Sequence, residues 1–129
     1  MPRAKQLTLS VADRPGTLGE IAAALGEKKV NIVGLAAATQ GGGGMIWLVV
    51  DRTATARKVL EKNGWRATEE EVLAVTLSDA PGSLGRLATK LGKAGVNIRF
   101  AYAGSASSAR KLTVYMGVSD LKAALKAAR

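Results

Sequence analysis

The feature that most constrains this chain is an internal repeat. Residues 7–32 align without a gap on residues 73–98, at an offset of 66, and 12 of the 26 aligned positions are identical. Identity of this extent indicates two copies of one structural unit. Because the chain has only 129 residues, each copy is small, and we predict a first domain over residues 1–71 and a second over residues 72–129.

Each copy begins with the pattern of a strand followed by a turn. Residues 7–11 alternate apolar and polar side chains, which is typical of a strand that is buried on one face. Pro15 and Gly16 then end the strand, since proline lacks the N–H of a strand ladder and glycine tolerates unusual dihedral angles. Pro81 and Gly82 stand at the same place in the second copy.

A helix is predicted after each turn. We expect Thr17 to cap the first helix, with Glu20 completing a capping box. Ser83 replaces Thr17 in the second copy, but Arg86 stands where the box requires an acid, so this cap is expected to be weaker. Apolar residues at helical spacing, such as 18, 21, 22 and 25, predict the face that packs on the sheet.

The rest of the first copy completes a ferredoxin-like pattern. We expect a second strand from residue 30 onward, a hairpin loop at the four glycines 41–44, and a third strand over residues 45–51. A helix over residues 51–63 and a fourth strand over residues 65–71 follow. The order β-α-β-β-α-β predicts an α+β fold with an antiparallel sheet, strand order 4-1-3-2, and both helices on one face.

The second copy is predicted to lack its last strand, because its second helix, residues 120–129, ends the chain. The first strand of this copy, residues 73–78, would then have no neighbour on one side, and its unpaired backbone groups would attract another strand. The third strand of the first copy is apolar on both faces. We therefore expect a homodimer, and a truncated chain is the competing explanation for the missing strand.

Two short motifs make the sequence similar to the ACT domain family. The first is Asp13-Arg14-Pro15-Gly16-Thr17-Leu18-Gly19, which recurs as Asp79-Ala80-Pro81-Gly82-Ser83-Leu84-Gly85. The second is Asn31-Ile32, which recurs as Asn97-Ile98. The chain thus resembles a stand-alone protein of two ACT domains. The resemblance implies a non-catalytic regulatory protein that binds an amino acid, commonly between ACT units, and modulates a metabolic enzyme.

The residues of these motifs have chemistry that suits an amino-acid ligand. A helix N-terminus presents N–H groups and the positive end of a dipole to a carboxylate. An aspartate at the turn can accept hydrogen bonds from an ammonium group, and an asparagine can both donate and accept. A glycine in the first helical turn leaves room for a ligand. The candidate ligand-binding residues are Asp13, Arg14, Pro15, Gly16, Thr17, Leu18, Gly19, Asn31, Ile32, Asp79, Ala80, Pro81, Gly82, Ser83, Leu84, Gly85, Asn97 and Ile98.

A purely structural interpretation of the same residues stays open. Pro-Gly is a common turn, Gly19 can be a packing contact, and Asp13 and Asn31 can brace the loop and the strand start. The chain would then be an ACT module that only binds a partner. The copies also differ, since Arg14 of the first corresponds to Ala80 of the second, so the first copy is expected to be the better anion binder.

Composition excludes several other functions. The chain has no His and no Cys, which removes disulfides, thiolate nucleophiles, imidazole catalysis and the usual zinc sites. The one acidic cluster, residues 69–71, is interpreted as a solvated strand edge or junction, so we expect neither an enzyme nor a metal or cofactor. No targeting segment or membrane-length apolar run is present, which predicts a cytoplasmic protein that does not enter a membrane.

An RNA-binding module is the alternative that the net charge of +9 suggests, and RNA-recognition motifs share the β-α-β-β-α-β order. Such modules stack bases on aromatic side chains, however, and only 4% of this chain is aromatic. The two third strands carry one aromatic residue each, Trp47 and Tyr115. The charge is also divided almost evenly, +5 up to Arg66 and +4 beyond it. These observations argue against nucleic acid as a partner.

Overall fold

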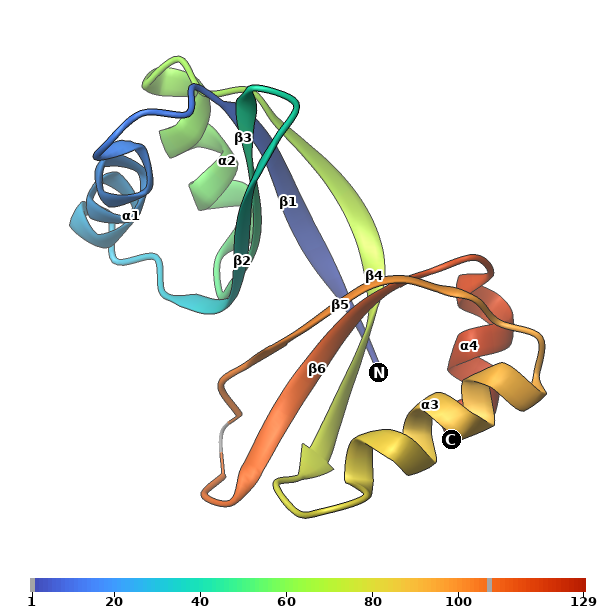
Figure 1. The fold of residues 1–129 in the computed structure, drawn as a ribbon. Helices are drawn as coiled ribbons and strands as arrows, with labels where there is room; N and C mark the ends of the chain where they lie inside the picture. The colour runs from blue at the N-terminus through green and yellow to red at the C-terminus, as the bar shows by residue number, and fades with distance from the viewer. Residues whose placement is uncertain (1, 107) are drawn as a thin grey trace. The chain divides into compact units, whose positions relative to one another are not determined.

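The alternating and helical patterns of the sequence appear as strands and helices in the computed structural model (Figure 1), which describes residues 2–106 and 108–129. Met1 and Ser107, which the expected domain ranges include, lie outside the described residues. The elements are β1 (Arg3–Val11), α1 (Thr17–Glu27), β2 (Ile32–Gln40), β3 (Gly43–Val50), α2 (Thr53–Lys62), β4 (Ala67–Ser78), α3 (Ser83–Lys93), β5 (Ile98–Gly104), β6 (Lys111–Val118) and α4 (Leu121–Ala127). The fold is therefore α+β, and the strand pairs described below are antiparallel.

The described residues divide into two compact units. The first unit is Lys5–Glu70, and the second contains Glu71–Arg129 together with the residues that precede Lys5. The expected domain boundary at residues 71 and 72 falls inside β4, which runs without interruption from Ala67 to Ser78. The two strands expected over residues 65–71 and 73–78 are thus both present from Ala67 onward, but they form one continuous strand.

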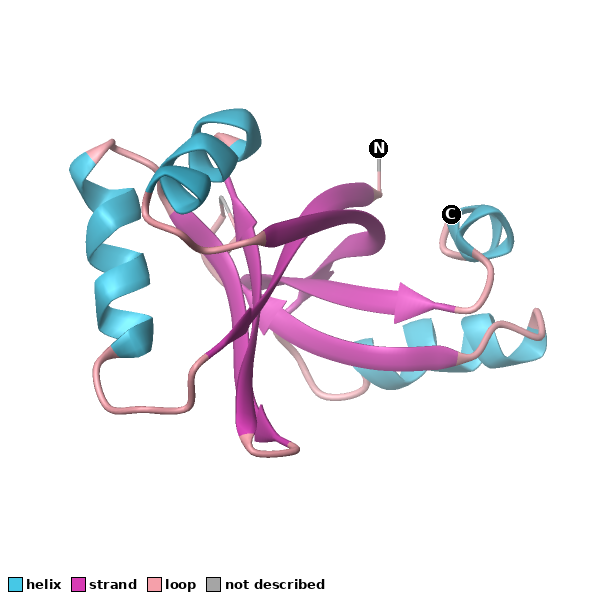
Figure 2. Ribbon diagram, turned by 90° about the horizontal axis from the view of Figure 1, so that it is seen from above, coloured by secondary structure: helices cyan, strands magenta, loops and turns pink. Residues whose placement is uncertain are grey.

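In the first unit, β3 lies between β1 and β2. The buried side chains of β1 and β3 join those of α1 and α2 in one core that includes Leu7, Ile21, Leu48 and Leu60. Both helices therefore cover the same face of these strands, as the coloured elements in Figure 2 also show. Gly41 and Gly42 have φ angles of 59° and 81°, so the expected hairpin loop is a tight two-residue turn.

The second unit repeats this arrangement, with β6 between β4 and β5. Its separate core contains Leu73, Leu87, Leu91 and Met116, which come from β4, α3 and β6. The last helix, α4, is capped by Asp120, whose side chain accepts a hydrogen bond of 3.0 Å from the Ala123 N–H. This helix packs on the same core through Ala124.

The first strand of the second copy has a neighbour on its outer side. The Ala74 N–H of β4 donates a hydrogen bond of 3.0 Å to the Pro2 carbonyl. Arg3 also pairs with Glu71 at 3.2 Å. The expectation that residues 73–78 have no neighbour on one side is therefore wrong at Ala74, where Pro2 lies on the side that a fourth strand would take.

Deletion of residues 2–4 tests this role of the N-terminus. A backbone hydrogen bond contributes about 1 kcal/mol, so the Ala74 amide should exchange its hydrogen about fivefold faster after deletion. Val75 is the internal control, because alternate residues of a strand direct their amides to opposite sides. Hydrogen exchange followed by NMR measures both amides. Equal acceleration of the two would contradict the assignment.

Candidate functional site

A cavity lies beside the turn between β1 and α1 of the first unit. Its volume is about 300 Å³, and it is lined by residues 11–14, 17, 18, 37–39 and 44–46. These residues come together because β1 and β2 both pair with β3, so that Val11 and Thr39 each lie opposite Gly44. The closed end of the β2–β3 hairpin, next to its two-residue turn, therefore adjoins the turn between β1 and α1.

The second unit holds a cavity at the equivalent place. It has a volume of about 380 Å³ and is lined by residues 77–80, 83, 84, 101–103, 112 and 114. Residues 77–80, 83 and 84 match residues 11–14, 17 and 18 at the offset of the repeat. Its wall is more apolar than that of the first cavity, because Leu77, Leu84, Tyr102, Leu112 and Val114 contribute to it.

The two helices beside these cavities begin at a glycine. Gly16 and Gly82 occupy the N-cap positions with φ angles of 92° and 87°, and neither helix has a side-chain cap. These left-handed angles favour glycine, which has no Cβ. The predicted caps at Thr17 and Ser83 are therefore wrong, because both residues already lie in the first helical turn.

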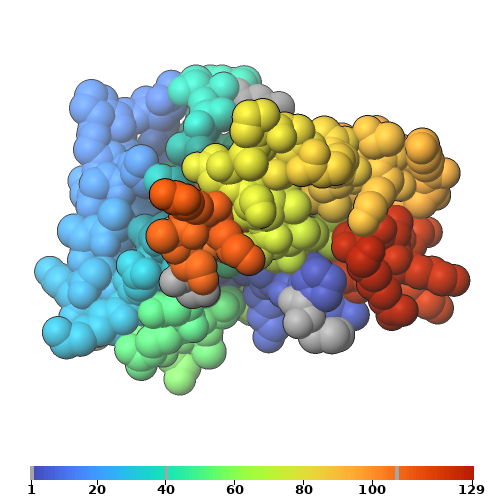
Figure 3. Space-filling model, turned by 90° about the horizontal axis from the view of Figure 1, so that it is seen from below, coloured from blue at the N-terminus to red at the C-terminus, as the bar shows by residue number. Residues whose placement is uncertain are grey.

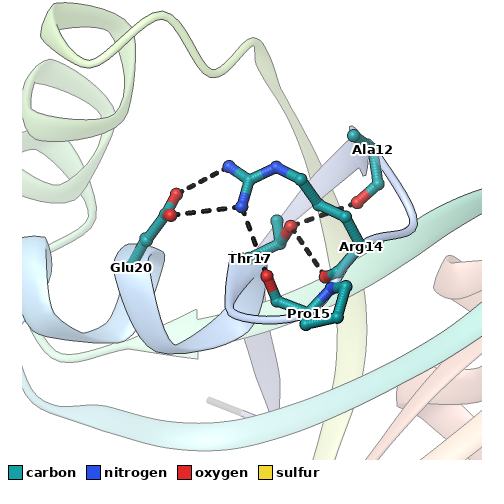
Figure 4. A network of polar contacts seen from close by, with 5 residues as sticks. All are labelled: Ala12, Arg14, Pro15, Thr17 and Glu20. Atoms are coloured by element: carbon teal, nitrogen blue, oxygen red, sulfur yellow. Dashed lines mark hydrogen bonds and ion pairs between the residues drawn. The ribbon is translucent and has the colours of Figure 1, made fainter.

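Figure 4 shows where the polar side chains of the first turn go instead. The Thr17 hydroxyl donates to the carbonyls of Ala12 and Arg14, at 3.2 Å each. Glu20 does not complete a capping box, since its carboxylate accepts two hydrogen bonds from Arg14, at 2.9 and 3.2 Å. Thr17 thus bonds to two carbonyls of the loop, and Glu20 fixes the position of the Arg14 side chain.

The Arg14–Glu20 pair changes the electrostatics of the first cavity. The hydrogen bond from Arg14, and after it the arginine charge, lower the pKa of Glu20, while the same contacts raise the pKa of Arg14. The carboxylate therefore offsets the guanidinium charge. The expected preference of the first copy for anions stays a prediction, and Ala80 leaves the second cavity without an equivalent of Arg14.

The candidate aspartates lie at the cavity walls. Asp13 accepts a hydrogen bond of 3.4 Å from the Thr39 hydroxyl, which ties the turn to the end of β2. Asp79 is held through its backbone, whose N–H donates to the Arg110 carbonyl at 2.7 Å. Both residues are exposed. Each cavity therefore has an accessible carboxylate beside the N-terminus of a helix.

The structure does not bring the candidate asparagines to these cavities. The Asn31 N–H donates a hydrogen bond of 2.9 Å to the Asp51 carboxylate, and the Asn31 carbonyl accepts one of 3.1 Å from the Asp51 N–H. Asn97 is bound in the same way by Ser119. Eight residues of extended chain separate Asn31 from Thr39, on the order of 25 Å. Within one unit, Asn31-Ile32 and Asn97-Ile98 therefore lie at the opposite end of the sheet from the turns.

The remaining candidates shape the turns. Pro15 and Pro81 do not line the cavities, and neither do Gly16 and Gly82 at the N-caps. For a Cβ added at Gly19 or Gly85, no heavy atom of the described residues outside the local helix backbone lies within 4 Å. Neither glycine is therefore required by a packing contact in this part of the chain, and each leaves open space at the first turn of its helix.

Several cavity residues escaped the sequence reasoning, namely Ala37, Ala38, Thr39, Gly44, Met45 and Ile46 in the first unit and Tyr102, Ala103, Leu112 and Val114 in the second. The available signal was the predicted strand order. A sheet that places the third strand between the first and second brings the hairpin end to the turn after the first strand. The position of the turn motif, combined with this strand order, would have predicted that the hairpin forms the second wall of each cavity.

Metal-binding clusters and membrane-spanning helices are both absent from the described residues. No group of three or more Asp or Glu side chains is placed to hold a metal ion. Within the same residues, no helix combines the length and apolar character needed to cross a bilayer.

Comparison with solved structures identifies the fold. Protein BT0572 from Bacteroides thetaiotaomicron superposes with a TM-score of 0.88 at 22% identity, covering 98% of this chain and 86% of that one. The regulatory subunits of aspartate kinase from Thermus thermophilus (ligand-free form) and Thermus flavus both give a TM-score of 0.68. Their identities are 18% and 19%, with coverage of 98% and 99% of this chain and 90% and 91% of theirs. At these identities the similarity establishes the fold.

Comparison at the level of sequence is narrower. Curated protein sequences gave no significant match. The sequence profile of the ACT domain matches residues 5–62, which are almost the whole first unit and contain its turn motif, its cavity and Asn31. Over these residues the chain is similar to the ACT domain family.

Proposed function

We propose that this chain is a non-catalytic regulatory protein that binds an amino acid at the turns 11–18 and 77–84. The observation that carries the proposal is the pair of equivalent cavities, each with an exposed aspartate beside a helix N-terminus. The aspartate would bind the ammonium group, and the helix N-terminus would bind the carboxylate. A site of this kind recognises the two charges that every amino acid carries.

The second cavity is the stronger candidate, and its walls suggest the ligand. Leu77, Leu84, Tyr102, Leu112 and Val114 form an apolar wall, which favours an amino acid with an apolar side chain. In the first cavity, the Arg14–Glu20 ion pair lies at the turn, and β2 contributes the small side chains of residues 37–39. We therefore assign the higher affinity to the second unit.

The proposed architecture is a tandem of two ferredoxin-like ACT units, the second completed by Pro2–Ala4 in place of its missing strand. Support comes from the repeat, from the equivalent turns and from the Ala74–Pro2 hydrogen bond. Leu18 and Leu84, 39% and 54% exposed, lie at the cavities and offer apolar surface to a second copy of the chain. A homodimer would cover them, and light scattering that gives a 13.3 kDa monomer would contradict this part of the proposal.

The proposed partner is a metabolic enzyme whose activity the amino acid controls. Support comes from the aspartate kinase regulatory subunits, which share the fold over almost the whole chain. The RNA-binding alternative has less support, since Tyr115 is only 5% exposed and thus closed to base stacking.

A thermal-shift screen of the twenty amino acids tests the proposal. A ligand at 100 times its Kd stabilises the folded state by about 2.7 kcal/mol, so one or a few apolar amino acids should raise the melting temperature. Asp79→Asn should abolish the shift, whereas Asp13→Asn, the matched change in the first unit, should largely preserve it. A stable chain with no shift for any amino acid would favour the module that binds only a partner.

A further inference from the structure

A third cavity lies in the second unit and shares no lining residue with the cavity at the turn between β4 and α3. It has a volume of about 330 Å³ and is lined by Pro2, Arg3, Lys122, Leu125, Lys126 and Arg129. We call this cavity the basic groove. Figure 3 shows the N-terminal residues (dark blue) beside α4 (red) on one face of the molecule. Four of the six lining residues are cationic, and none is acidic.

The charge of the basic groove is only partly compensated. Arg3 is paired with Glu71 at 3.2 Å. Over the part of the chain that the structure describes, Lys122, Lys126 and Arg129 form no ion pair, and all three are exposed. Like charges that converge on a concave surface repel one another, and an anion in the groove would remove this repulsion.

Helix stabilisation does not account for all of these cations. Lys126 lies in the last turn of α4 and Arg129 lies just beyond it, where positive charge complements the helix dipole. Lys122, however, is the second residue of the same helix, where a cation is unfavourable. Its position one turn before Lys126 places both ammonium groups along one side of the helix. The groove therefore contains a cation for which the helix itself gives no reason.

We propose that the basic groove is a further ligand site, which binds a small molecule carrying two or more phosphate groups. The volume is in the range of small-molecule sites. Residues 122, 126 and 129 span about 10 Å of chain along α4, the scale of a di- or triphosphate group. Leu125 and Pro2 provide an apolar surface for the uncharged part of the ligand.

Among polyanions, the structure favours a small phosphorylated molecule over a nucleic acid or an acidic peptide. The lining contains no aromatic side chain on which a base of a single strand could stack. The four cations also line one cavity of about 330 Å³, whereas a polymer requires a row of cations that continues over a longer surface. The basic groove is separate from the proposed amino-acid cavities, since it shares no lining residue with either of them.

Isothermal titration of the whole chain with ATP and with pyrophosphate at 150 mM NaCl, using adenosine as the uncharged comparison, tests the proposal. Lys122→Gln/Lys126→Gln should weaken the binding of both phosphates at least tenfold. The matched control is Lys58→Gln/Lys62→Gln, which removes two exposed lysines at the same spacing from α2 and should change affinity less than twofold. Arg129→Gln provides a second variant, outside the helix, that should weaken binding in the same direction.

Three results would overturn the proposal. The first is an equal loss of affinity in the two double variants, because it would indicate attraction to the net charge alone. The second is the absence of binding for both phosphates. The third is binding of an RNA oligomer or a polyglutamate peptide in preference to ATP and pyrophosphate. Because none of these measurements involves an amino acid, the outcome is separate from that of the thermal-shift screen.

Discussion

Leu91→Ala is expected to lower the free energy of unfolding by about 3 kcal/mol, the order observed when a fully buried leucine is truncated and leaves a cavity. Leu91 is 0% exposed and packs in the core of the second unit with Leu73, Leu87 and Met116. Urea denaturation measures the loss. A loss below about 1 kcal/mol would mean that the core collapses around the missing side chain.

Leu84→Ala is the matched control, because it removes the same atoms from the same helix. Leu84 is 54% exposed and lines the second cavity. Its truncation should change the free energy of unfolding by less than about 0.5 kcal/mol. The same variant should reduce the amino-acid-induced thermal shift, since it removes part of the apolar wall. A stability loss equal to that of Leu91→Ala would contradict the burial that distinguishes the two leucines.

The contrast between these two leucines shows what the sequence could predict. Helical spacing identified the apolar residues of α3, and strand alternation identified those of β1, because burial imposes a period on the sequence. Periodicity did not distinguish Leu84 from Leu91, since both are apolar residues of the same helix. Only the packing of α3 on β4 and β6 decides that one is buried in the core and the other lines a cavity.

The helix starts were predicted less well, for a local reason. A threonine or serine before an apolar helix is normally read as its cap, but Gly16 and Gly82 adopt left-handed angles and begin the helix one residue earlier. Thr17 then bonds to the loop, and Glu20 is left to bind Arg14. A Pro-Gly pair before the threonine was thus the more informative signal.

The role of the N-terminus depends on contacts that no local pattern records. Residues 2–4 precede the repeat, so nothing in the alignment connects them with residues 73–78. The connection appears only when β4 extends through both copies and Ala74 bonds to Pro2. The basic groove is likewise formed by residues far apart in the sequence, such as Arg3 and Lys122. Local sequence patterns therefore predict the two units but not the features that distant segments form together.

Gly117→Ala is expected to destabilise the chain by about 2 kcal/mol through overpacking. Gly117 of β6 lies opposite Phe100 of β5, next to an irregularity in the register between Ile98 and Phe100. A Cβ on Gly117 would lie 2.7 Å from Cδ2 of the Phe100 ring and nearer still to Cε2 and Cζ. The ring would have to move, although it stacks on Tyr102 at 6.4 Å and lies under Arg99 at 5.4 Å.

Two variants separate this steric cause from a general intolerance of glycine replacement. Gly85→Ala adds the same methyl group where, among the residues described, no heavy atom outside the local helix backbone lies within 4 Å, and it should raise stability by up to about 1 kcal/mol because alanine favours helix. Phe100→Leu should relieve part of the cost of Gly117→Ala, giving a coupling energy of at least 0.5 kcal/mol in a double-mutant cycle. Additive losses would show that the ring is not the obstacle. Coupling would establish that Gly117 is required so that Phe100, and with it the aromatic stack of β5, can lie flat against β6.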